Sequence, residues 1–125
     1  MRLRKVSMAK INKLTEVDEW VKLWDGLKSP DAAADFIFKL SPICPTSHHA
    51  EEIVGRYLAT LPESPKLQIY SVDVIAARPV SQRIAADTQV THQSPQAILI
   101  NAARVIAFDA SHGDIDDDLL EKLPR

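Results

Sequence analysis

The residues with the clearest chemical potential are a single cysteine and the three that follow it, in the order Cys44-Pro45-Thr46-Ser47. Proline is well tolerated at the first position of a helix, where its missing N–H would have no partner in any case. We therefore expect a helix to begin at Pro45, with Cys44 as N-cap and the N–H groups of Thr46 and Ser47 directed at the sulfur. Helix N-termini stabilise anions, so this position favours a thiolate with a lowered pKa.

Ser47 stands at the second position of a C-x-x-C spacing, the pattern of dithiol redox sites. A thiolate at Cys44 is the nucleophile that disulfide exchange requires, but Ser47 cannot form the internal disulfide that releases a substrate. A mixed disulfide on Cys44 must then be resolved by an outside thiol. Two plainer interpretations stay open: Cys44 is a small buried side chain, and Ser47 is an ordinary residue of a first helical turn.

The segments around this motif predict an alternation of helices and strands. Apolar residues recur at helical spacing after a candidate capping box at residues 15–18, and again after Pro45. Shorter helices are predicted from Pro79 to about residue 87 and from Ile115 to Leu123. Short apolar or alternating runs indicate strands near residues 36–40, 67–74, 97–100 and 105–108.

The order of these elements predicts an α/β fold. The first two strands are joined through a helix, so they should be parallel with a right-handed crossover, whereas the last two form a hairpin. A mixed four-stranded sheet with helices on both faces follows. Apart from an extra N-terminal helix, this is the element order of the thioredoxin fold. We expect a single thioredoxin-like domain at residues 14–125, preceded by a basic tail at residues 1–13.

Ser94-Pro95-Gln96 lies immediately before the third predicted strand. In the thioredoxin fold this position holds a cis-proline that packs against the active cysteine, so we expect a cis Ser94–Pro95 bond within reach of Cys44, although trans is the general default. The backbone of Ser94 would then pair with an extended substrate segment. The candidate catalytic residue is Cys44, and the candidate substrate-binding residues are Pro45, Thr46, Ser47, Ser94, Pro95 and Gln96.

Several motifs stand at fixed separations along the chain: Phe36-Ile37-Phe38-Lys39, Ser41, Cys44-Pro45, Ser47, Arg78-Pro79, Ser81, His92, Ser94-Pro95-Gln96 and Ala110-Ser111-His112. In this combination the sequence resembles the monothiol bacilliredoxins, the YtxJ family of the bacillithiol redox system, from about residue 14 to residue 123. The resemblance implies a thioredoxin fold in which Cys44 takes bacillithiol from S-bacillithiolated proteins. The chain departs from the family pattern at Leu40, where histidine is common, and at Gly113, where tryptophan is usual.

The same resemblance implies the partners of the reaction. S-thiolated client proteins are the expected substrates, and bacillithiol or a similar low-molecular-weight thiol is the expected co-substrate, with no tightly bound cofactor. A second small thiol or a partner reductase would resolve the adduct on Cys44. Two alternatives from other classes remain: a redox-inert thioredoxin-fold adaptor, and a thiol sensor that is modified at Cys44 without turnover.

Composition narrows the remaining function classes. The 125 residues are 46% hydrophobic and 26% charged, which suits one globular domain. A net charge of −2 argues against nucleic-acid binding, and no apolar run approaches the ~20 residues of a membrane-spanning helix.

The N-terminal sequence and the cysteine and histidine content indicate the cellular compartment and the potential for metal binding. A lone cysteine suits a reducing compartment, and the basic start is not followed by the apolar run of a signal peptide, so we expect a cytoplasmic protein. We expect no metal site, because a zinc site needs about four converging ligands and no paired ligand motif is present. The residues that invite a metal hypothesis are Cys44, His48, His49, His92 and His112.

Overall fold

The computed structural model describes residues 9–124, which form one five-stranded mixed sheet with helices on both faces. The strands lie in the order β1-β3-β2-β4-β5. Neighbouring strands among β1, β3 and β2 are parallel, while β4 is antiparallel to both β2 and β5. The strands are β1 (Ile11–Lys13), β2 (Ala34–Leu40), β3 (Leu67–Asp73), β4 (Gln96–Asn101) and β5 (Val105–Ser111).

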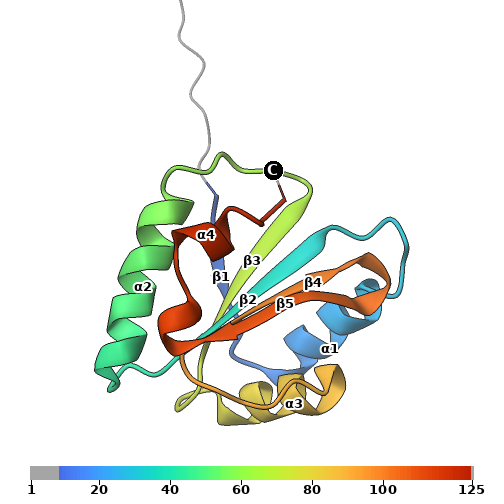
Figure 1. Cartoon of the computed structure of the whole chain (residues 1–125). Helices are drawn as coiled ribbons and strands as arrows, with labels where there is room; N and C mark the ends of the chain where they lie inside the picture. The colour runs from blue at the N-terminus through green and yellow to red at the C-terminus, as the bar shows by residue number, and fades with distance from the viewer. Residues whose placement is uncertain (1–8, 125) are drawn as a thin grey trace, which may run out of the picture.

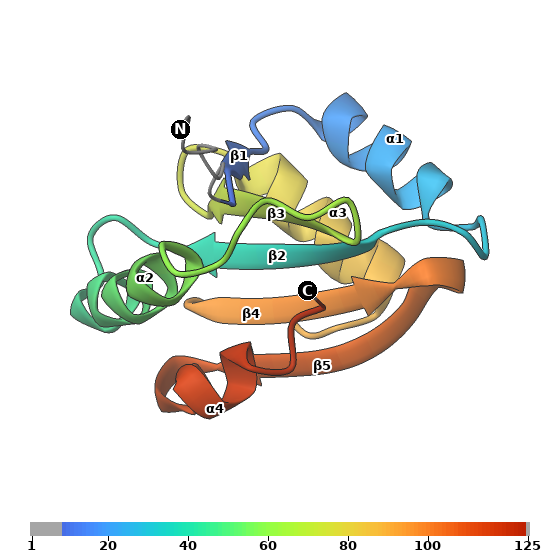
Figure 2. The same cartoon turned by 90° about the horizontal axis from the view of Figure 1, so that it is seen from above.

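The helices occupy the connections that the sequence predicted. They are α1 (Val17–Gly26), α2 (Pro45–Leu58), α3 (Arg78–Thr88) and α4 (Asp117–Leu120), with short 3-10 turns η1 (Ala102–Arg104) and η2 (His112–Asp114). Figures 1 and 2 show α1 and α3 on one face of the sheet and α2 and α4 on the other. No helix within residues 9–124 is both long and apolar enough to cross a membrane.

The alternation of side chains along β2 builds both layers of the core. Phe36 and Phe38 point to the α2 side, where they join a buried cluster with Val54 of α2. Ile37, between them, points to the opposite face and packs in a second cluster with Trp20 of α1. Because β2 is central and covered on both faces, three apolar residues, Phe36-Ile37-Phe38, follow one another without polar alternation.

The first strand adds a fifth member to the predicted four-stranded sheet. Ile11–Lys13 form β1 and pair in parallel with β3, with Ile11 opposite Ile69 and Lys13 opposite Ser71. Its three residues are all exposed, as suits a short edge strand. The part of the predicted tail at residues 1–8 lies outside the described residues, and the part at residues 11–13 is sheet.

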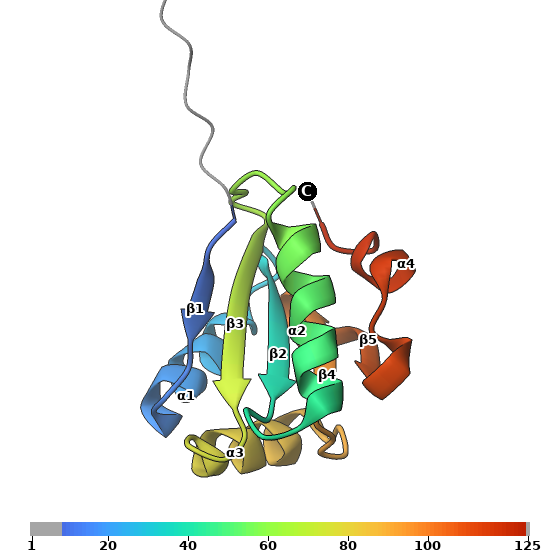
Figure 3. The ribbon, with the colours of Figure 1, turned by 90° about the vertical axis from the view of Figure 1, so that its left-hand side faces the viewer.

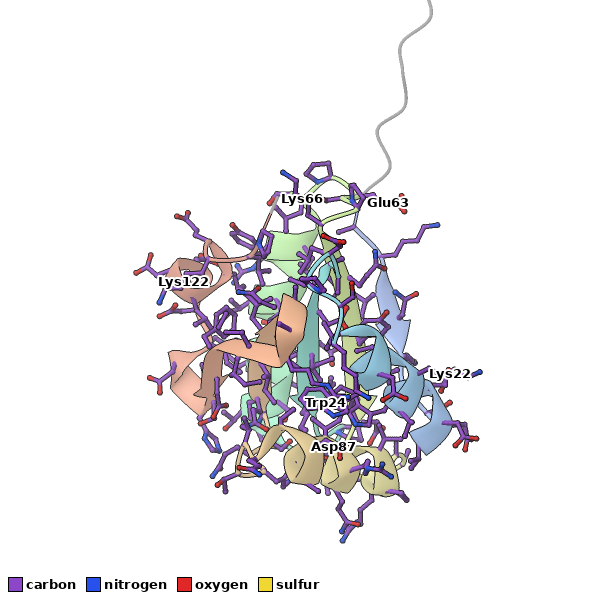
Figure 4. All side chains as sticks on the ribbon, turned by 90° about the vertical axis from the view of Figure 1, so that its right-hand side faces the viewer. Lys22, Trp24, Glu63, Lys66, Asp87 and Lys122 are labelled. Atoms are coloured by element: carbon purple, nitrogen blue, oxygen red, sulfur yellow. The ribbon has the colours of Figure 1, made fainter. Side chains whose placement is uncertain are left out.

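Helix α1 is fixed to α3 and to the β4–β5 turn by its two tryptophans. Trp20 is fully buried, stacks on Trp24 with ring centroids 5.5 Å apart, and donates from its indole nitrogen to Asp87 of α3 at 2.8 Å. The Arg104 guanidinium lies 4.3 Å from the centroid of the Trp24 ring, and its Nε donates to the Trp24 carbonyl. Figure 4 shows Trp24 and Asp87 in this contact region. Trp20 is therefore part of the core, and the half-buried Trp24 packs against it.

Candidate active site

Cys44 stands at the junction of β2 and α2, where the sequence placed it. Strand β2 ends at Leu40, a short turn follows, and Cys44 is the N-cap of α2 with extended backbone angles of φ −103° and ψ 120°. The Cys44 N–H donates to the Ser41 carbonyl at 3.3 Å, and the Cys44 carbonyl accepts from the His48 N–H at 3.1 Å. The thiol is free and half-buried.

The first turn of α2 stabilises a thiolate at this position. The Ser47 N–H contributes most to lowering the pKa of the Cys44 thiol from its ordinary value. Partial burial opposes this effect, while the Thr46 N–H and the hydroxyls of Ser47 and Thr46 lower the pKa further. Pro45 has no N–H, so these two residues provide the first free backbone donors of the helix. The predicted direction of the Cys44 pKa is thus confirmed, with its expected cause.

Ser47 has a second role that the sequence did not reveal. Its side chain is fully buried, and its hydroxyl accepts a hydrogen bond from the Ser41 N–H at 3.0 Å. The residue therefore fixes the turn before Cys44 while also facing the sulfur. His48 does not act on the thiol, because its Nε2 donates to the Pro42 carbonyl at 2.8 Å and it is not among the groups that lower the Cys44 pKa.

The Ser94–Pro95 bond is cis, as predicted. Pro95 is buried, and the next residue, Gln96, begins β4 opposite Lys39 near the end of β2. The proline and Cys44 therefore lie at the same end of the sheet, although contact between the Pro95 ring and the Cys44 sulfur stays a prediction. The Ser94 hydroxyl is buried and has no hydrogen-bond partner within residues 9–124.

Gln96, one of the expected substrate-binding residues, has its side chain engaged inside the protein. It is fully buried, and its amide nitrogen donates at 2.9 Å to both the Thr91 carbonyl and the Asp109 carboxylate. Its amide oxygen accepts from the Gln93 N–H at 3.3 Å. Because both ends of the amide are engaged inside the protein, Gln96 holds the loop before β4 in place, and its contact with a substrate stays a prediction.

A polar cluster around the buried Lys39, which the sequence reading missed, lies behind this loop. Lys39 is fully buried on β2, and its Nζ donates to the Ser81 carbonyl at 3.0 Å and lies 3.4 Å from Nδ1 of His92. The Ser81 hydroxyl is 3.2 Å from the same His92 nitrogen. Burial lowers the pKa of Lys39 to about 8, with the Asp109 carboxylate opposing that effect.

The titration of His92 is coupled to the same cluster. Burial, followed by the nearby charges of Lys39 and Arg78, lowers the pKa of His92 from its ordinary value. The ring therefore favours its neutral form near neutral pH. Within residues 9–124 no group of three or more His, Cys, Asp or Glu side chains is arranged to hold a metal ion.

Comparisons with known proteins agree with this geometry. A family model described as "Monothiol bacilliredoxin BrxC" matches residues 12–120. A comparison with curated protein sequences gives no significant match.

Among solved structures, a thioredoxin-fold protein assigned as an oxidoreductase is 26% identical, with a TM-score of 0.71 over 90% of this chain and 91% of that one. The thioredoxin of Nicotiana alata is 12% identical with a TM-score of 0.66, over 95% and 93% of the two chains. That of Fasciola hepatica is 17% identical with a TM-score of 0.64, over 90% and 95%. The predicted thioredoxin fold is confirmed.

Proposed function

The chain belongs to the monothiol bacilliredoxin family and has a thioredoxin-like fold, and from this premise we propose that it is a cytoplasmic oxidoreductase that removes bacillithiol from S-bacillithiolated proteins. The observation that carries the proposal is the chain's single cysteine, half-buried at a helix N-terminus that lowers its pKa. The membership and the fold support a thiol redox role, and the removal of bacillithiol is the step that remains to be measured.

The first step of the proposed reaction is a thiol–disulfide exchange at the small thiol. The Cys44 thiolate attacks the bacillithiol sulfur of the mixed disulfide, and a new S–S bond forms between Cys44 and bacillithiol. The client's sulfur leaves as a thiolate and takes a proton from water. The client cysteine is reduced and Cys44 is oxidised, so no outside oxidant is needed.

The second step regenerates the enzyme with an external thiol. A second bacillithiol, as thiolate, attacks the bacillithiol sulfur on Cys44, forms the small-molecule disulfide and releases the Cys44 thiolate. Ser47, at the position where a dithiol enzyme has its resolving cysteine, offers no sulfur for this step. A partner reductase with its own thiol is an equivalent resolving agent. Since all electrons move between sulfurs, the cycle requires no tightly bound cofactor, nucleic acid or membrane.

The proposed substrate contacts come from the residues around Cys44 and the loop before β4. The first turn of α2, Pro45 to Ser47, supports the thiolate, while the backbone of Ser94 and the Pro95 ring border the approach of an extended client segment.

The test is removal of bacillithiol from a purified S-bacillithiolated protein, followed by mass spectrometry. Reduced protein should release the client thiol and gain the mass of one bacillithiol on Cys44, and added bacillithiol should restore the free thiol over many cycles. Cys44→Ser, which keeps size and fold, should do neither. Release of the client thiol by Cys44→Ser at the wild-type rate would refute the proposal.

Two measurements separate the alternatives. The first is the Cys44 pKa, measured by thiolate absorbance. An inert adaptor predicts a value near that of free cysteine, whereas the first turn of α2 lowers the pKa. A sensor predicts fast adduct formation and slow release, so single-turnover and steady-state rates would differ widely. A parallel assay with glutathionylated client tests which small thiol is preferred.

A further inference from the structure

We propose that a basic pocket at the same end of the sheet as the thiol binds a carboxylate of the small thiol carried on Cys44. The inference rests on the proposed function and adds to it a place for the acidic part of the co-substrate. The pocket has a volume of about 200 Å³ and lies where β3 runs into α3. It is lined by Val74, Ile75, Arg78, Ser81, Gln82 and His92.

Main-chain contacts place the pocket at the same end of the sheet as Cys44. The Val74 N–H donates to the Leu40 carbonyl at 3.0 Å, which joins the end of β3 to the turn that leads to Cys44. His92 lies on the loop that continues through Ser94 and Pro95 into β4. Figures 1 and 3 show the segments that lead into α2, α3 and β4 gathered at this one end of the molecule.

The charge of the pocket is positive and uncompensated. Arg78 is exposed, and its guanidinium makes no ion pair or hydrogen bond within residues 9–124. No acidic residue lines the pocket. Asp73, at the end of the strand that leads into the pocket, turns its carboxylate to the N–H groups of Ile75 and Ala76 at 2.9 and 3.0 Å. An anion bound here meets no negative group of the lining.

The polar cluster around Lys39 determines which nitrogen of His92 can donate a hydrogen bond to a ligand. Nδ1 of His92 faces two donors, the Lys39 ammonium at 3.4 Å and the Ser81 hydroxyl at 3.2 Å, so this nitrogen is the acceptor. In a neutral ring the proton then lies on Nε2, which leaves His92, a lining residue of the pocket, with one N–H to donate. Lys39 is therefore a positioning residue that fixes the tautomer of His92.

Together these groups form a donor set suited to a carboxylate. A guanidinium and an imidazole N–H both donate, and Arg matches carboxylate geometry especially well. A cation would find no negative ligand here. The pocket is small enough for the acidic arm of a low-molecular-weight thiol whose sulfur is on Cys44.

The test compares three small disulfides as substrates of the full-length reduced protein. They are dithiodipropionate, which carries carboxylates, hydroxyethyl disulfide, which is neutral, and cystamine, which carries amines. The second-order rate constants for modification of Cys44 are divided by those of free cysteine to remove intrinsic reactivity. We expect the wild type to prefer the carboxylate probe to the neutral one by about five-fold at low salt, the range of an exposed ion pair, and to react least with cystamine.

Substitutions on α3 test whether the preference for the carboxylate probe depends on the pocket. Arg78→Gln should reduce the ratio of carboxylate to neutral rates about five-fold, and Arg78→Lys should retain most of it. Arg83→Gln, which makes the same charge change on the same helix at an arginine paired with Asp87, should leave the ratio at its wild-type value.

The outcomes separate this inference from the proposed function. No carboxylate preference in the wild type, an unchanged ratio in Arg78→Gln, or an equal loss in Arg83→Gln would overturn the subsite while leaving the redox function intact. A Cys44 that reacts with none of the three disulfides would overturn both.

Discussion

The buried carboxyl group of Asp35, on β2, provides a quantitative test of the packing around that strand. Asp35 is only 5% exposed, and its carboxyl group makes no hydrogen bond or ion pair within residues 9–124. Burial raises its pKa from 3.8 to about 7. Tyr70 of β3 and Lys22 of α1 line the shallow pocket beside it, and Figure 4 shows Lys22 on the outer side of α1.

The sign of the pH effect follows from the raised pKa. Between about pH 4 and pH 7 the folded state holds a proton on Asp35 that the unfolded chain has lost, so stability falls as pH rises through this window. A shift of about 3 units at about 1.4 kcal/mol per unit sets an upper limit of about 4 kcal/mol on the loss. The stability that the protonated Asp35 provides is complete below pH 3.8, the ordinary pKa of the group, and is lost above about pH 7.

Asp35→Asn should therefore remove this pH dependence. We expect the variant to exceed the wild type in free energy of unfolding by about 2 kcal/mol near pH 8, because the buried amide without a partner offsets part of the ~4 kcal/mol. Near pH 5 the difference should be close to zero. Urea denaturation at a series of pH values measures it, with the exposed Asp31→Asn as a control for the same charge change. Parallel pH curves for wild type and Asp35→Asn would refute the reasoning.

Three further changes test the site. Ser47→Ala leaves the Ser41 N–H without its side-chain acceptor, so it should lower the free energy of unfolding by about 1 kcal/mol in urea denaturation. Loss of the Ser47 hydroxyl should also raise the Cys44 pKa, which thiolate absorbance measures, and a lowered pKa would contradict this. Ser47→Cys should form an internal disulfide with Cys44, and an oxidised variant that has not lost two hydrogens by mass would count against the helix-start geometry. Lys39→Met removes a charge that lowers the pKa of His92, so that pKa should rise in an NMR titration, and no change would argue against the Lys39–His92 contact.

The position of Cys44 could be predicted because its determinants are local. A buried apolar strand, a turn between two prolines, and a proline at the first helical position all lie within about ten residues of the cysteine. The cis bond at Pro95 was also predictable, although only through the fold, since its own neighbours in the sequence do not specify the isomer.

The features that the sequence missed depend on distant partners. Strand β1 is three residues long and exposed, without an apolar pattern, and pairs with residues 58 positions away (Ile11 with Ile69). Lys39 is the next-to-last residue of β2, and its partners are contributed by α3 and the loop after it, 42 and 53 residues further along the chain. A lysine inside the apolar run of a central strand is the one sequence signal that could have marked the cluster.

The location of the two tryptophans determines what fluorescence can report. Trp20 and Trp24 are the only tryptophans in the chain, and both belong to α1. Trp20 donates a hydrogen bond to Asp87 of α3, and the Trp24 ring lies under the Arg104 guanidinium. The residue before Cys44 is the exposed Ile43, so no indole adjoins the thiol in the sequence. Intrinsic emission should thus follow the opening of the α1 layer and stay nearly constant as the sulfur cycles between thiol and mixed disulfide. Unfolding can then be followed optically under oxidising and reducing conditions alike, while turnover needs a label on the substrate.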